Sequence, residues 1–117
     1  MSTAFITLDS VTHLSDEHRG SVSYCASHGG TYAGYYAAKM GVGAVILNDA
    51  GIGWEMAGIS GLDLLGGLGV PAAAVSHRSA RIGDGEDGFS RGVLSTVNRS
   101  ALAMGLAPGM ACREALE

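Results

Sequence analysis

The chain is poor in charged residues. Asp, Glu, Lys and Arg make up only 15% of its 117 residues, whereas apolar residues make up 47%. This balance excludes a disordered chain and predicts a single globular domain over residues 1–117. A surface with so little charge is typical of a subunit that hides part of itself against a partner, so we expect a homo-oligomer.

Basic residues and long apolar runs are also scarce. Seven Lys and Arg face eleven Asp and Glu, which gives a net charge of −4. Without a basic run or stripe, we expect no nucleic-acid binding. No stretch reaches the roughly 18 apolar residues of a membrane span, and the first ten residues lack the charged start of a signal peptide. We therefore expect no membrane association.

Cysteine is nearly absent, and the P-loop motif is missing. The two cysteines, Cys25 and Cys112, are far apart and lack the spacing of a metal site, which favours a reduced, cytoplasmic setting. No G-x-x-x-x-G-K-[ST] occurs, and the glycines of 51–58 have the wrong spacing for G-x-G-x-x-G, so we predict no cofactor. His28, His77 and Asp49 would make a set of two histidines and one carboxylate, but no local pair of ligands supports it, and we predict no metal.

Glycine, by contrast, is abundant, with 19 residues that cluster after apolar runs, where turns are expected. Short apolar runs predict strands at 4–8, 22–25, 44–47 and 70–75, and helical composition predicts helices at 31–40, 59–68 and 98–106 and a short one at the C-terminus. This alternation predicts an α/β fold with a small, mainly parallel β-sheet and helices on its faces, in a Rossmann-like three-layer arrangement.

Three segments leave local structure open. A single helical turn is expected at 15–18, and residues 89–96 are compatible with either a helix or a strand. In the polar stretch 81–88 we expect Asp87 to cap the following helix, and we leave open whether Asp84 caps a turn or faces a ligand.

Polar residues follow three of the predicted strands. Ser27-His28-Gly29-Gly30 follow the strand at 22–25, Asn48-Asp49 follow the strand at 44–47, and Ser76-His77 follow the strand at 70–75. Because the carboxyl ends of parallel strands lie along one edge of a sheet, these residues should gather at the crevice where such folds bind ligands. The sequence therefore predicts a small-molecule site at this edge.

The stretch Cys25-Ala26-Ser27-His28-Gly29 places a serine between a strand and a helix. Its setting resembles the nucleophile elbow of α/β hydrolases, and the resemblance covers residues 21–53. It implies that Ser27 is a nucleophile and that the backbone N–H of His28 helps to stabilise an oxyanion.

Serine, histidine and aspartate at neighbouring strand ends suggest an acyl-transfer centre. In this reading His77 takes the proton from Ser27 and Asp49 orients the imidazole, with His28 as an alternative base. The leading function is thus a small-molecule enzyme of hydrolase or acyl-transfer type. In the structural alternative, the Ser27 hydroxyl accepts backbone N–H bonds at the start of the helix.

A second function is open from the same residues. Gly29, Gly30 and Thr31 at a helix start would present N–H groups to a phosphate or carboxylate. Arg78 or Arg81 would add a bidentate contact, and Asp84 would act as an acid or as the partner of Arg81. Together with His28, Asn48 and Ser76, these residues would form the ligand-binding site of a non-catalytic module that binds a small anion as an oligomer.

Overall fold

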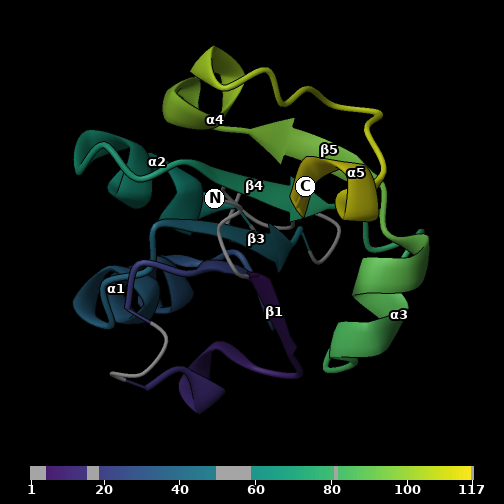
Figure 1. Cartoon of the computed structure of the whole chain (residues 1–117), viewed down its shortest axis with the longest axis horizontal. Helices are drawn as coiled ribbons and strands as arrows, with labels where there is room; N and C mark the ends of the chain where they lie inside the picture. Colours follow the sequence, from purple (N-terminus) through teal and green to yellow (C-terminus); the bar gives the residue numbers. More distant parts are fainter. Residues whose placement is uncertain (1–4, 16–18, 50–58, 81, 117) are drawn as a thin grey trace.

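A five-stranded sheet runs through the middle of the protein (Figure 1). The computed structural model describes residues 5–15, 19–49, 59–80 and 82–116. The strands lie side by side in chain order: β1 (Phe5–Leu8), β2 (Val22–His28), β3 (Ala44–Asn48), β4 (Ala72–Val75) and β5 (Leu94–Val97). The first four are parallel and β5 is antiparallel to β4. The predicted small, mainly parallel α/β sheet is therefore confirmed.

Helices cover both faces of this sheet. One face packs against α1 (Thr31–Lys39), α2 (Ser60–Gly67) and the 3-10 helix η1 (Val11–His13), and the other against α3 (Gly85–Arg91) and α5 (Cys112–Leu116). A short helix, α4 (Arg99–Ala103), follows β5. Connections between parallel strands are right-handed, and the strands from β1 to β4 are added in one direction across the sheet. The connections therefore lie on the same face, which explains why α1 and α2 share one layer. In the described part of the chain, no helix is long and apolar enough to cross a membrane.

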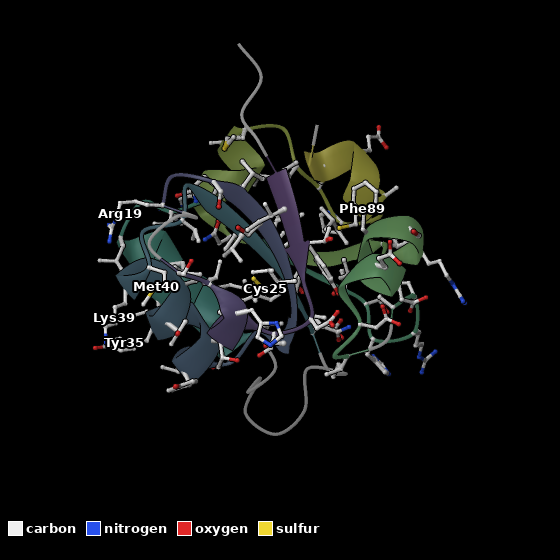
Figure 2. All side chains as sticks on the ribbon, turned by 60° about the horizontal axis from the view of Figure 1, so that its bottom comes forward. Arg19, Cys25, Tyr35, Lys39, Met40 and Phe89 are labelled. Atoms are coloured by element: carbon white, nitrogen blue, oxygen red, sulfur yellow. The ribbon has the colours of Figure 1, made fainter. Side chains whose placement is uncertain are left out.

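Alternating side chains of the central strands supply the two cores. On β3, Val45 and Leu47 face the α1–α2 layer, whereas Ile46 joins Tyr24 in the core beneath α3 and α5. A strand buried on both faces needs the continuous apolar run that the sequence has here. Figure 2 shows Cys25 in the interior and Phe89 on the side of α3 and α5.

The two helices of the first layer meet through glycines. A Cβ atom added to Gly34 of α1 would lie 2.7 Å from the Gly61 carbonyl oxygen of α2 and 2.8 Å from its Cα atom. The Gly61 amide also donates to the Gly29 carbonyl, at 2.8 Å. Because glycine has no Cβ, the two backbones can approach this closely, and the start of α2 is fixed against the start of α1.

Asn98 joins three elements at the opposite end of the sheet. Its side-chain amide donates to the carbonyls of Leu62 and Val70, at 3.1 and 3.0 Å. Its Oδ1 accepts from the amides of Ala72, at 3.0 Å, and Ala101, at 2.9 Å. All four hydrogen-bonding positions of the buried side chain are thus used to connect α2, β4 and α4.

Local structure differs from the sequence prediction at three places. A 3-10 turn that the sequence analysis did not predict lies at Val11–His13, where the Ser10 hydroxyl accepts the Thr12 amide. The helical turn expected at 15–18 falls mostly on residues 16–18, which lie outside the described part. The ambiguous segment 89–96 contains both the end of α3 and the start of β5. The helix predicted over 98–106 is shorter, since the chain turns at Gly105 with φ of +94°.

The predicted cap of α3 was also wrong. Asp84, not Asp87, stands at the N-cap, where its Oδ1 accepts the Asp87 amide at 3.0 Å. Asp87 lies in the first turn of the helix and faces Arg91 one turn later, with 3.6 Å between their charged atoms. An exposed pair of this kind contributes little stability.

Buried titratable groups predict alkaline instability. Burial raises the pKa of the Cys25 and Cys112 thiols from 9.0 to about 12. Burial also raises the pKa of Tyr24 above its ordinary value, and its hydroxyl, beside the Asn48 side chain, has no hydrogen-bonding partner within the described residues. The folded state therefore holds protons that the unfolded state releases above pH 9. Its stability should be fully present below pH 9 and fall as pH rises towards 12.

Urea unfolding between pH 7 and 11 measures this loss. Above pH 9, the free energy of unfolding should fall by about 1.4 kcal/mol per pH unit for each thiol, and below pH 9 it should stay constant. A variant with Cys25→Ala and Cys112→Ala serves as the control, because it should show a shallower decline over the same range. An equally steep decline in wild type and double variant would contradict the assignment to the thiols.

Candidate active site

The predicted gathering of polar residues at one edge of the sheet follows from the parallel pairing of β2, β3 and β4. Residues 27–31 follow or end β2, Asn48 and Asp49 lie at the end of β3, and Ser76 and His77 follow β4. Within this row, one group of side chains is in direct contact.

Asp49 is the centre of that group. Its side chain is only 6% exposed, and its Oδ1 atom accepts the backbone amide of His77 at 3.0 Å. The same oxygen lies 3.3 Å from His77 Nδ1. The predicted pairing of Asp49 with His77 is therefore present in the structure. A carboxylate at this distance fixes the orientation of the imidazole ring.

The second carboxylate oxygen is held by Ser95, a residue that the sequence analysis did not single out. Ser95 Oγ donates to Asp49 Oδ2 at 2.6 Å. In the register between β4 and β5, Ala74 pairs with Thr96 and Val75 with Leu94, so Ser95 is an extra residue in β5. Such a β-bulge turns a side chain away from its regular direction. No pattern in the sequence predicts it, because the contact depends on the antiparallel pairing of a segment whose structure was ambiguous.

Hydrogen bonds hold the turn that carries His77. The Ser76 hydroxyl accepts the Arg78 amide at 3.2 Å, and the Ser76 carbonyl accepts the Ser79 hydroxyl at 2.8 Å. From β3, the buried Asn48 side chain donates to the Ala80 carbonyl at 3.1 Å. Asn48 and Ser76 were predicted to bind a ligand, and here both act on the backbone of the turn. Their contacts keep the imidazole of His77 in place beside Asp49.

His77 is nonetheless accessible. Its side chain is 46% exposed, whereas that of Asp49 is almost completely buried. A buried carboxylate behind a half-exposed imidazole leaves the ring open to a small molecule while its orientation is fixed from behind. This is the arrangement that a general base requires.

Ser27 is in a different environment. It lies in an irregular part of β2, where three residues, 25–27, stand opposite a single residue of β3, Leu47. Its hydroxyl accepts the Val11 amide at 2.8 Å. The Ser27 and Ser10 hydroxyls are 3.3 Å apart. Within the described residues Ser27 makes no hydrogen bond to His77, from which β3 separates it. Its role as a nucleophile stays a prediction, and the contact that it makes here supports η1.

The glycine-rich turn joins two helix starts. Gly30 is the N-cap of α1, and Gly29 donates to the Asn48 carbonyl at 2.8 Å. The hydroxyls of Thr31 and Ser60, the first residues of α1 and α2, are 2.9 Å apart. These contacts connect the helices to each other and to β3. Binding of an anion at Gly29, Gly30 and Thr31 stays a prediction.

The other predicted ligand-binding residues are His28, Arg81 and Asp84. His28 is the last residue of β2, Arg81 lies outside the described residues, and Asp84 caps α3. Among the described residues, no three His, Cys, Asp or Glu side chains are grouped closely enough to hold a metal ion.

Comparison with known proteins finds no match: no protein-family model, no curated protein and no solved structure is detectably similar to this chain.

Proposed function

We propose that the protein is a small-molecule enzyme of hydrolytic type, with His77 as its general base. The observation that carries this proposal is the contact between His77 Nδ1 and the buried Asp49 carboxylate, at 3.3 Å. A carboxylate behind an imidazole selects the tautomer with its proton on Nδ1 and leaves Nε2 to accept a proton. The carboxylate in turn is held by Ser95 Oγ.

The reaction that fits this arrangement is the attack of water on an activated carbonyl. His77 Nε2 takes a proton from water as the water oxygen bonds to the carbonyl carbon, and Asp49 stabilises the imidazolium that forms. The imidazolium then returns the proton to the leaving group as the tetrahedral intermediate collapses. No serine is needed for this sequence, which agrees with the engagement of Ser27 by η1.

Hydrolysis of p-nitrophenyl acetate and p-nitrophenyl butyrate tests the proposal. The His77→Ala variant should lose about 100-fold or more in kcat/KM, because general-base catalysis contributes on the order of 10²–10⁴ to rate. Asp49→Asn should also lose activity, since the carboxylate charge behind the ring is removed while an oxygen remains to accept the His77 amide. Ser27→Ala should stay within about twofold of wild type if water is the nucleophile.

The control is His13→Ala, which removes an exposed histidine on η1. It should leave the rate unchanged. The proposal fails if wild type hydrolyses neither ester faster than free imidazole at the same concentration, or if His77→Ala, shown to be folded by circular dichroism, retains full activity.

A further inference from the structure

A second site lies farther along the same edge of the sheet. A pocket of about 290 Å³ opens between η1, the end of β2, the start of α1 and residues 82–83. It is lined by Asp9, Ser10, Val11, Thr12, Ala26, Ser27, Tyr32, Ala33, Ile82 and Gly83. None of Asp49, His77 and Ser95 belongs to this lining, so the pocket is separate from the candidate active site.

The apolar part of the pocket is suited to a flat hydrophobic body. Val11, Ala26 and Ala33 are buried, and the two alanines leave space that larger side chains would fill. Two large side chains in the lining are exposed to solvent: Tyr32 is 65% exposed and Ile82 is 48% exposed. A bound ring would cover both, and the release of water from apolar surface would favour binding.

The wall formed by α1 and η1 is fixed in advance. The rings of Tyr32 and Tyr36 pack with centroids 6.2 Å apart, at 38° to each other. The Tyr36 hydroxyl donates to the Thr12 carbonyl at 3.4 Å, which ties α1 to η1. A preformed pocket avoids part of the ordering cost that binding otherwise incurs.

The polar part of the pocket offers oxygen acceptors. The Ser10 hydroxyl lies 2.9 Å from that of Thr12 and 3.3 Å from that of Ser27. Asp9 adds a carboxylate, of which Oδ1 accepts the Gly85 amide at 2.7 Å. Its Oδ2 makes no hydrogen bond to any residue that the structure describes, and this oxygen is free for a ligand. A charged acceptor of this kind makes its strongest hydrogen bond with a cationic donor.

We propose that this pocket binds a small aromatic molecule that carries a primary ammonium group. The ring lies against Tyr32 and Ile82, and the ammonium group donates to Asp9 and to the hydroxyls beside it. The volume stands at the lower end of the range for ligand pockets, which suits one ring on a short chain rather than a larger molecule. The inference does not depend on the role of His77.

Three probes of nearly equal size test it: 2-phenylethylamine, 2-phenylethanol and 3-phenylpropionate. They are titrated into the protein while the amide shifts of Val11, Tyr32 and Gly83 are followed by NMR. The amine should give saturable shifts and bind about tenfold more tightly than the alcohol, as one charge-assisted hydrogen bond predicts. The carboxylate should bind more weakly than either.

Two variants separate charge from packing. Asp9→Asn keeps the oxygen that accepts the Gly85 amide and removes the charge, so the amine should then bind no better than the alcohol. Tyr32→Ala should weaken both. The matched control is Tyr35→Ala, which removes an exposed tyrosine of the same helix that does not line the pocket and should change neither affinity.

The proposal is overturned if the amine gives no saturable shifts at these amides. It is also overturned if 3-phenylpropionate binds as tightly as the amine, or if Tyr35→Ala weakens binding as much as Tyr32→Ala does. These readouts require no catalytic activity, so they are independent of the ester-hydrolysis test.

Discussion

Replacing Asn98 by alanine should destabilise the protein by about 3–5 kcal/mol, as expected when several buried polar groups lose their partners together. The side chain makes four hydrogen bonds, two as donor and two as acceptor, all to backbone groups. Alanine would leave these backbone groups without their partner where α2, β4 and α4 meet. Chemical denaturation followed by circular dichroism measures the loss.

An isosteric variant distinguishes hydrogen bonding from the filling of space. Asn98→Asp keeps the shape and the acceptor oxygen, but it points a second oxygen at the carbonyls of Leu62 and Val70, so it should also be strongly destabilising. Arg99→Ala, at the next and exposed position, should change stability by less than about 0.5 kcal/mol. Near-normal stability of both Asn98 variants would show that the side chain is dispensable.

Replacing Gly34 by alanine should cost about 2 kcal/mol or more, in spite of the better helix propensity of alanine. The new methyl group would meet backbone atoms of Gly61 at 2.7 and 2.8 Å, and backbone cannot turn aside as a flexible side chain can. The two helices would have to move apart. Overpacking of this kind typically costs about 1–3 kcal/mol, and contacts between α1 and α2 that are lost as they separate would add to this cost. The shift of the urea midpoint measures the effect.

Gly67 provides the matched control. It is the last residue of α2, and a Cβ atom added there would meet nothing within 4 Å. Gly67→Ala should therefore be neutral or stabilise the protein by up to about 1 kcal/mol, through helix propensity alone. If Gly34→Ala were stabilising to the same degree, the close approach of α1 and α2 would not constrain the fold.

The fold could be predicted from the sequence because its signals are local. The apolar run at 44–47 and the alanine-rich run at 72–75 are typical of strands buried on both faces, and both are strands in the structure. The prediction failed where a single hydrogen bond decides a boundary. Ser10 and Asp84 each begin a helix by accepting one amide, and nearby serines and aspartates were equally good candidates.

The candidate site could be predicted only in part. Asp49 and His77 follow adjacent parallel strands, so topology alone brings them together. Ser95 could not be found, since its direction depends on a bulge in an antiparallel strand. The contact of Ser27 with Val11 could not be anticipated either, because it depends on how the segment after β1 folds back over β2. The expectations of a homo-oligomer and of a cytoplasmic setting stay predictions.

The order of the strands has a consequence for synthesis on the ribosome. Each strand from β1 to β4 adds beside the one made just before it, and α1 and α2 cover one face as they emerge. The opposite face, with Tyr24 and Ile46, is covered by α3 and α5, which are made after these four strands. Until α5 has left the ribosome, the nascent chain is a half-covered sheet, and this interval is when it most needs shielding from other unfinished chains.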